Sequence, residues 1–217
     1  MTSVNKPFLV SLHIPKTAGT SLESILHKKY GEKLYRYNHD PELLKTKKVD
    51  WILDNYEAIH GHFNVNQFDL TDKNVSAFCF IREPYERVSS HFNYYREYSV
   101  VGEVCQAVHK GEMDFETFVF SPGMKNLQSR MMGKYEMSEF DLVGNSSQFN
   151  TYLPEIISLT GCDSTVKEYQ RLNVAKSGVK YLEQPSAEFL AKFKEFHSKD
   201  YQLFSLLNIS NNNSHAA

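Results

Sequence analysis

Cationic, hydroxyl and glycine residues gather in one short segment near the start of the chain, HIPKTAGTSL at residues 13–22. An apolar run, FLVSL, precedes this segment, and a helix-like run, SLESILHKKY, overlaps its end and continues the chain. Ligands of parallel α/β sheets bind where strands end, and a helix N-terminus adds N–H donors and partial positive charge. The segment therefore predicts a site for a phosphate-like anion. Its candidate residues are Lys16, Thr17, Ala18, Gly19, Thr20 and Ser21.

Each residue type in this segment has a chemical reason to be there. Lys16 supplies a point charge, and Gly19 permits either a positive φ or a close approach of the backbone. The three hydroxyl side chains can donate hydrogen bonds. The alternative interpretation is a tight strand-to-helix turn whose helix is capped by Thr20 or Ser21.

The segment at residues 13–22 is a strand-to-helix corner, a place where an expected strand leads into an expected helix. A second such corner follows the most apolar run of the chain, Val75–Ile81. Arg82 comes directly after this run, where its planar guanidinium can bind a phosphate through two N–H donors. Ser90 lies eight residues further on, about two turns along the helix expected there. The alternative for Arg82 is a surface ion pair with Glu83 or Glu86. Two such corners imply a ligand with two separated phosphate-type groups.

Strands that alternate with helices predict an α/β fold: a single domain, residues 1–208, with a mostly parallel central sheet flanked by helices. The expected strands are Phe8–His13, Ala58–Phe63 and Val75–Ile81, with a further short apolar segment at Phe140–Val143. The expected helices are Thr20–Tyr30, Pro41–Lys48, Pro84–Tyr98, Asp114–Phe120, 127–137, Phe149–Leu159 and Ala187–Leu207. The composition of residues 209–217 predicts a disordered tail.

Overall composition excludes several classes of protein. A net charge of −2 over 217 residues gives no general attraction to nucleic acid or to membranes, so an anion site must be local. Three widely spaced cysteines form neither a disulfide framework nor a zinc ligand set. The first apolar run is too short for a signal peptide or a membrane span. We therefore expect a cytoplasmic protein.

These motifs resemble those of sulfotransferases that use 3′-phosphoadenosine 5′-phosphosulfate (PAPS). HIPKTAGTSL resembles their 5′-phosphosulfate loop, and FIREPYERVSSHFNYY resembles their 3′-phosphate motif, Arg-x-Pro-x-x-Arg-x-x-Ser. The segment IHGHF, residues 59–63, resembles the histidine-bearing segment of the carbohydrate branch and, within it, of heparan sulfate 2-O-sulfotransferase-like proteins. Weaker resemblances link 126–133 to a Gln-x-Arg stretch, 140–144 to a later strand and 173–178 to a late cofactor-contacting loop.

The resemblance implies a P-loop-NTPase-like (sulfotransferase) fold, no metal, and transfer of a sulfuryl group from PAPS to a hydroxyl acceptor, leaving 3′-phosphoadenosine 5′-phosphate. Lys16 would stabilise the bridging oxygen of the leaving phosphate. Arg82 and Ser90 would hold the 3′-phosphate. The acceptor is expected to be a sugar alcohol, and a lipid or secondary-metabolite hydroxyl is the alternative.

Transfer also needs a base for the acceptor's proton, and an imidazole titrates in the right range. His60 and His62 both qualify, because residues i and i+2 of a strand share a face. The resemblance favours His62 as the base and His60 as a supporting or acceptor-orienting group. A zinc site at these histidines is disfavoured, because no cysteine or carboxylate cluster supplies the other ligands.

Three further residues are candidates for holding the cofactor. Arg130 would bind the nucleotide or the sulfate, and the alternative is a solvated charge on a helix. Lys176 and Ser177 would close over the cofactor, and the alternative is an ordinary loop.

Two other functions fit parts of the pattern. A small P-loop kinase also has an anion loop between strand and helix, but here no GK[ST] ending and no acidic strand end suit magnesium. A non-catalytic nucleotide- or glycan-binding module on the same fold is the second alternative. Lys16, His60 and His62 argue against it.

Overall fold

The computed structural model describes residues 6–37, 49–98, 101–162 and 185–214. These residues belong to two compact units, which we describe separately. The first unit comprises residues 1–81 and 131–172, and the second comprises 82–130 and 173–217. The β-sheet belongs to the first unit.

Within the described residues, five parallel strands form one sheet in the order β2-β3-β1-β4-β5. The strands are β1 (Phe8–Leu12), β2 (Leu34–Tyr37), β3 (Ala58–Gly61), β4 (Val75–Ile81) and β5 (Leu142–Asn145). The prediction of an α/β fold with a mostly parallel sheet is confirmed. The short strand β2 was not expected from the sequence.

The register of the central strands brings the predicted loop and the histidine segment together. Leu12 at the end of β1 pairs with Gly61 at the end of β3 and with Cys79 of β4. Since the strands are parallel, their carboxyl ends share one edge of the sheet. The segments that begin at His13 and His62 therefore leave the sheet side by side.

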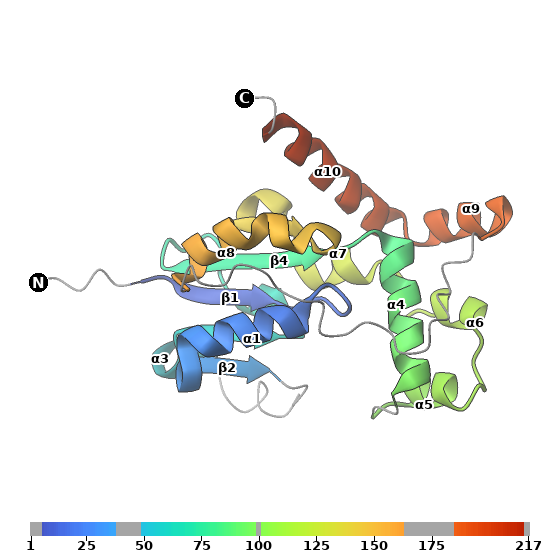
Figure 1. The fold of residues 1–217 in the computed structure, drawn as a ribbon, viewed down its shortest axis with the longest axis horizontal. Helices are drawn as coiled ribbons and strands as arrows, with labels where there is room; N and C mark the ends of the chain where they lie inside the picture. Colours follow the sequence, from blue (N-terminus) through green and yellow to red (C-terminus); the bar gives the residue numbers. More distant parts are fainter. Residues whose placement is uncertain (1–5, 38–48, 99–100, 163–184, 215–217) are drawn as a thin grey trace, which may run out of the picture. The chain divides into compact units, whose positions relative to one another are not determined.

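Helix α1 (Gly19–Tyr30) follows β1 and covers one face of the sheet (Figure 1). Leu22, Ile25 and Leu26 lie on one stripe of this helix and are almost fully buried. The helix ends at Gly31, whose φ of 52° is easily adopted only by glycine. Truncating one of the buried leucines to alanine would cost about 2–5 kcal/mol.

Helix α8 (Leu153–Thr160) covers the same face and shares a core with α1. The predicted helix at Phe149–Leu159 is in fact a 3-10 segment, η4 (Ser146–Tyr152), followed by α8. The buried residues of this core are Leu9, Leu22, Ile25, Leu26, Leu34, Ala58, Phe78, Phe80, Phe149, Tyr152, Leu153, Ile156 and Cys162.

The remaining described elements of the first unit are short. Helix α3 (Val49–Asn55) carries the half-buried Trp51, whose ring packs edge-on against Tyr35 and Tyr56. The helix predicted at Pro41–Lys48 lies outside the described residues. Three more 3-10 segments are η1 (Gly31–Lys33), η2 (Val65–Gln67) and η3 (Met137–Glu139).

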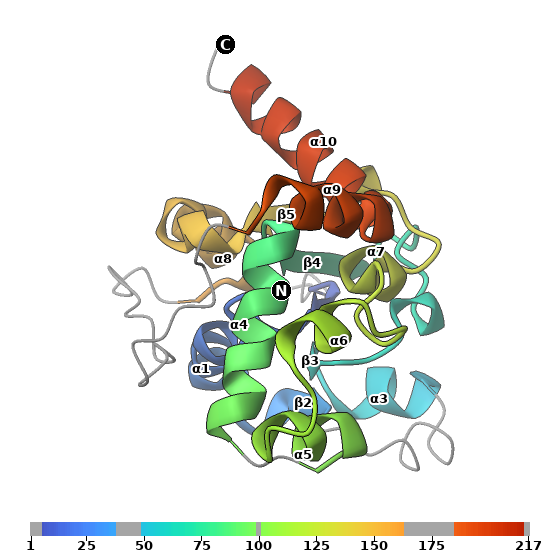
Figure 2. The ribbon, with the colours of Figure 1, turned by 90° about the vertical axis from the view of Figure 1, so that its right-hand side faces the viewer.

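Helix α4 (Pro84–Glu97) begins the second unit and has the predicted start. Proline suits the first turn of a helix, and the Glu83 side chain caps that turn by accepting the N–H of Glu86 at 2.7 Å. Helices α5 (Glu103–His109) and α6 (Phe115–Val119) lie beside α4 (Figure 2). The buried core of this unit consists of Tyr85, Val88, Phe92, Val108, Phe118, Val119, Met124 and Phe193.

The predicted closing helix at Ala187–Leu207 is two helices, α9 (Ala187–Phe196) and α10 (Ser198–Ser214). The break falls at His197, which is fully buried. Its Nε2 donates to the carbonyl of Val119 at 3.0 Å, and its Nδ1 accepts from the N–H of Asn126 at 3.4 Å. These two bonds to the main chain fix the side chain at the break. Helix α10 also extends into residues 209–214, where the composition predicts disorder.

The region predicted to be helical at 127–137 is a shorter helix, α7 (Leu127–Met132), followed by η3. Gly133, with a φ of 66°, comes directly after α7. A Cβ at this position would lie 2.1 Å from Oδ1 of Asn66, so only glycine fits. A glycine just past the last turn is a common end to a helix.

Candidate functional site

The anion loop has an unusual backbone. Lys16 and Ala18 both adopt left-handed conformations, with φ of 72° and 71°. For residues other than glycine, such conformations cost of order 1–3 kcal/mol each and concentrate at functional sites. The loop therefore keeps a shape that the local sequence does not favour.

Helix α1 starts directly from this loop. Ala18 precedes its first residue, and no side chain caps the helix. The carbonyl of Ala18 accepts the N–H groups of Ser21 and Leu22, both at 3.1 Å. The N–H groups of Gly19 and Thr20 precede these in the first turn, where the helix has no carbonyl to offer them. Anions bind readily at such a helix start.

The predicted residues of the loop differ in exposure. Lys16 is half-buried and Thr20 is exposed, whereas Thr17 and Ser21 are buried. The hydroxyl of Thr17 donates to the carbonyl of Ile14 at 2.8 Å. A hydroxyl has one proton to donate, so this side chain shapes the loop and does not offer that proton to an anion.

A glycine is needed at position 19 because another side chain approaches its backbone closely. The sequence allows two reasons for this glycine, a positive φ and a close approach. Its φ is not positive, but a Cβ at this position would lie 1.7 Å from Nε2 of His13. The imidazole of His13 thus lies directly against the first residue of α1.

Three imidazoles are stacked at the carboxyl ends of β1 and β3. The ring of His13 lies 4.1 Å from that of His62 and 5.1 Å from that of His60, between centroids. The sequence places His13 at the end of an expected strand and not among the candidate residues, and so misses its central place in this cluster. The signal that could have identified His13 is the pairing of Leu12 with Gly61, because this pairing brings the next residues, His13 and His62, side by side.

His60 is not placed to take a proton from an acceptor. Its side chain is only 3% exposed, and its Nδ1 lies 2.9 Å from Oγ of Ser11. Burial, with a smaller contribution from His62, lowers the pKa of His60 to about 3. His60 is therefore neutral at physiological pH. A neutral, buried imidazole is compatible with the supporting role considered for His60.

His62 is half-buried and is the more accessible of the two predicted histidines. Its Nδ1 lies 2.5 Å from the main-chain carbonyl of His13. A carbonyl can only accept, so in the neutral ring Nδ1 carries the hydrogen and Nε2 carries the basic lone pair. The arrangement selects one tautomer and orients the ring.

At the second corner, Arg82 is held by its main chain. Its N–H donates to Oε1 of Gln128 at 2.8 Å, and its carbonyl accepts from Nε2 of Gln128 at 2.9 Å. Gln128 is fully buried. Its own N–H, like that of Ser129, donates to the carboxylate of the buried Asp200. Only a weak Gln-x-Arg resemblance pointed to Gln128, and nothing in the sequence pointed to Asp200.

The side chain of Arg82 forms the ion pair that the sequence offered as the alternative to anion binding. Its Nε lies 3.1 Å from Oε2 of Glu86, one turn into α4. This bond uses one of five N–H donors of the guanidinium. Ser90 is half-buried. Arg82 thus lies just before α4 and contacts Glu86 in its first turn, and Ser90 lies one turn beyond Glu86.

The other candidates are less informative. Arg130 is exposed, and its Nη2 donates to the carbonyl of Gly123 at 2.6 Å. This position is compatible with either role considered for Arg130. Lys176 and Ser177 lie outside the described residues.

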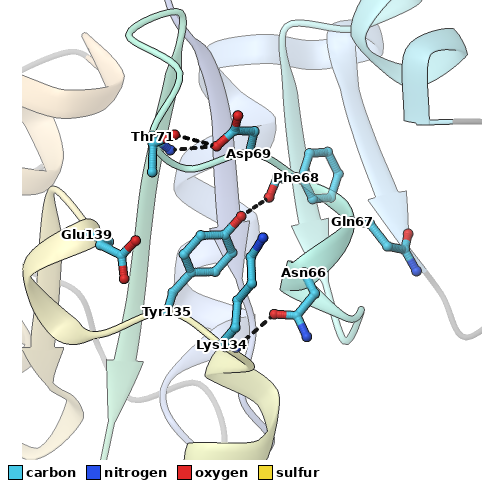
Figure 3. Close-up of a pocket in the computed structure, with 8 residues that line it drawn as sticks. All are labelled: Asn66, Gln67, Phe68, Asp69, Thr71, Lys134, Tyr135 and Glu139. Atoms are coloured by element: carbon cyan, nitrogen blue, oxygen red, sulfur yellow. Dashed lines mark hydrogen bonds between the residues drawn. The ribbon is translucent and has the colours of Figure 1, made fainter.

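A cavity of about 520 Å³ in the first unit lies away from these residues (Figure 3). One of its lining residues, Phe68, stacks on Phe8 at the amino end of β1, whereas the histidines lie at the carboxyl ends. Tyr135 donates its hydroxyl to the carbonyl of Phe68 at the cavity wall. The lining residues are Asn66, Gln67, Phe68, Asp69, Thr71, Lys134, Tyr135 and Glu139. The candidate loop and the histidines lie where β1 and β3 end, away from this cavity.

In the part of the chain that the structure describes, no group of three or more histidine, cysteine or carboxylate residues is placed to hold a metal ion. Over the same residues, no helix is both long and apolar enough to cross a membrane.

Comparisons with known proteins agree with this architecture. The model of the sulfotransferase family matches residues 2–206. Among solved structures, the chain is similar to mouse sulfotransferase SULT7A1 complexed with PAP, with a TM-score of 0.51 and 14% identity. The match covers 99% of this chain and 90% of the mouse chain. The predicted sulfotransferase-type fold is thereby confirmed. No curated protein matches the chain.

Proposed function

The chain belongs to the sulfotransferase family, and we propose that it transfers the sulfuryl group of PAPS to a hydroxyl of a carbohydrate, with His62 as the base. One observation carries the assignment of the base. The Nδ1 of His62 is bonded to the carbonyl of His13, the residue that opens the anion loop. The same residue places its ring against Gly19 at the start of α1. The proposed base and the start of α1 therefore both contact His13.

The 5′-phosphosulfate end of the donor is assigned to Lys16, Thr17, Ala18, Gly19, Thr20 and Ser21. The strained loop and the first turn of α1 fit an anion, because they combine main-chain donors with the half-buried cation of Lys16. Lys16 would stabilise the charge that develops on the leaving phosphate. Thr17 would act by holding the loop through Ile14.

The 3′-phosphate end is assigned to Arg82 and Ser90, with Arg130, Lys176 and Ser177 as further contacts. The contact of Arg82 with Glu86, and the position of Ser90 one turn beyond Glu86, support this role. The carboxylate of Glu86 opposes an anion there. A bound phosphate would therefore have to displace the carboxylate of Glu86 from the guanidinium of Arg82.

Proton transfer is assigned to Nε2 of His62. Bound PAPS supplies the sulfuryl group, and the acceptor oxygen must lose its proton as it bonds to sulfur. His62 would take that proton while its Nδ1–H stays on the carbonyl of His13. The neutral His60 would support the stack through its bond to Ser11 without competing for the proton.

The acceptor class rests on the resemblance of IHGHF to the carbohydrate branch. The test is transfer of labelled sulfate from PAPS to a panel containing hydroxylated glycans, a simple phenol and a lipid alcohol. We expect transfer to the glycans, and His62→Ala should lower it by about 10²–10⁴-fold. His27→Ala, which removes an exposed histidine of α1, is the control. Undiminished transfer by His62→Ala would refute the assignment of the base.

A further inference from the structure

Arg87 is a buried cation for which the fold supplies little compensation. It lies on α4, one turn before Ser90, and is 0% exposed. Among the described residues, its Nε and Nη2 have no hydrogen-bond partner. Its Nη1 lies at the limit of hydrogen bonding, 3.5 Å from Nδ1 of His91. Buried charges are normally paired, so an unpaired guanidinium needs an explanation.

The groups around Arg87 do not neutralise it. Burial lowers the pKa of Arg87 to about 10, so the side chain stays charged at neutral pH. Arg82 and Arg130 act on it with the same sign of charge, and Asp200 with the opposite sign. The carboxylate of Asp200, however, already accepts the N–H groups of Gln128 and Ser129 and the hydroxyl of Ser129. No carboxylate within the described chain forms an ion pair with Arg87.

The position of Arg87 relates it to the proposed 3′-phosphate site. Arg82 and Arg130 both act on Arg87 through their charge. Gln128 holds Arg82 by both main-chain groups, and Arg130 follows Gln128 by two residues. Positive charges in a low-dielectric surrounding act over longer distances than in water. A dianion bound by Arg82 and Ser90 would meet the field of Arg87 without touching its side chain.

We propose that Arg87 is a buried charge that serves the 3′-phosphate: its guanidinium, which forms no ion pair with the described residues, destabilises the nucleotide-free protein, and its field favours the bound phosphate. This inference rests on the proposed function. It assigns the phosphate preference partly to a residue that makes no contact with the ligand. It also predicts opposite effects of one substitution on stability and on binding, which a purely structural role does not.

The test uses the full chain and two ligands, adenosine 3′,5′-bisphosphate and adenosine 5′-phosphate, with affinities from calorimetry. Arg87→Met keeps a long side chain without the charge. Replacing an uncompensated buried charge by an apolar side chain is often neutral or stabilising. We therefore expect an unchanged or higher Tm without ligand. Affinity for the bisphosphate should fall about tenfold while affinity for the 5′-phosphate stays the same.

Two further variants complete the design. Arg87→Lys keeps the charge and should keep most of the preference for the bisphosphate, whereas Arg87→Gln should lose it even if Arg87→Met fails to fold. Arg96→Met removes an exposed arginine of the same helix and should leave the preference unchanged.

The outcomes separate this inference from the proposed function. A wild-type protein that binds both ligands equally would contradict the proposed 3′-phosphate site itself. A wild-type preference that survives in Arg87→Met and Arg87→Gln would overturn only the role of Arg87. Equal weakening of both ligands, or a large loss of Tm in every variant, would show a structural role and would also overturn it.

Discussion

Replacing Gly19 by alanine tests whether the anion loop and the base are mechanically connected. The new Cβ would lie 1.7 Å from Nε2, 2.0 Å from Cε1 and 2.1 Å from Cδ2 of His13. Carbon atoms in contact are normally about 3.5–4.0 Å apart, so the imidazole must retreat by about 2 Å. Its neighbour in the stack is His62, with ring centroids 4.1 Å apart. The displacement therefore reaches the base.

The expected effect is on the rate, with little effect on stability. A misplacement of about 1 Å at a reacting group can lower a rate by about 100-fold, which corresponds to about 2.7 kcal/mol. The free energy of unfolding should change by less than about 1 kcal/mol, because alanine favours the helix by about that amount over glycine.

The assay is turnover of PAPS with an accepted hydroxyl substrate, measured together with urea unfolding. A double-mutant cycle isolates the contact, because His13→Ala removes the ring that the new Cβ would meet. Gly19→Ala should then cost almost nothing more, which gives a coupling of about 2 kcal/mol. Gly123→Ala is the matched control, since a Cβ there would meet nothing within 4 Å. Additive effects, or full activity of Gly19→Ala, would refute the connection.

Two other predictions concern charge. Glu86→Gln should tighten binding of adenosine 3′,5′-bisphosphate about three- to tenfold, because it releases Arg82 and removes an opposing carboxylate; the exposed Glu112→Gln is the control, and weaker binding by Glu86→Gln would contradict the site. Burial lowers the pKa of His60 from 6.5 to about 3 and that of His197 to about 4, so below pH 6.5 the unfolded chain binds protons that the folded chain excludes. The free energy of unfolding should therefore fall as the pH falls toward 4, by about 2 kcal/mol per histidine at pH 5, and urea unfolding that is unchanged between pH 7 and pH 5 would disprove this.

The elements of the fold could be predicted where burial requires a continuous or periodic run of apolar residues in the sequence. Strand β4 is apolar on both faces because it lies inside the sheet, and the run VSAFCFI gives its bounds without error. Strand β2 is short and lies at the edge of the sheet, with Arg36 exposed. A run of four residues with two buried and two accessible side chains cannot be told from a loop by its sequence. The break at His197 was missed for another reason, because its partners lie about 70 residues away in the sequence.

The candidate site was predictable in its residue types and less so in its geometry. Spacing located both corners, because strand ends and helix starts are local features. It did not reveal the left-handed conformations of Lys16 and Ala18, since neither is a residue that favours them. Alternation puts His60 and His62 on one face, so the preference for His62 came from the resemblance. The structure adds their different hydrogen-bond partners, Ser11 for His60 and the carbonyl of His13 for His62.

Burial has opposite consequences for two enclosed basic side chains of these sites, His60 and Arg87. A buried imidazole loses its charge at little cost, so His60 becomes a neutral partner in a stack. A guanidinium cannot do this near neutral pH, so Arg87 keeps its charge. Evolution could have used an apolar residue at either place if packing alone were needed. At position 87 the retained charge is therefore better explained by an anion that the protein binds than by the fold that contains it.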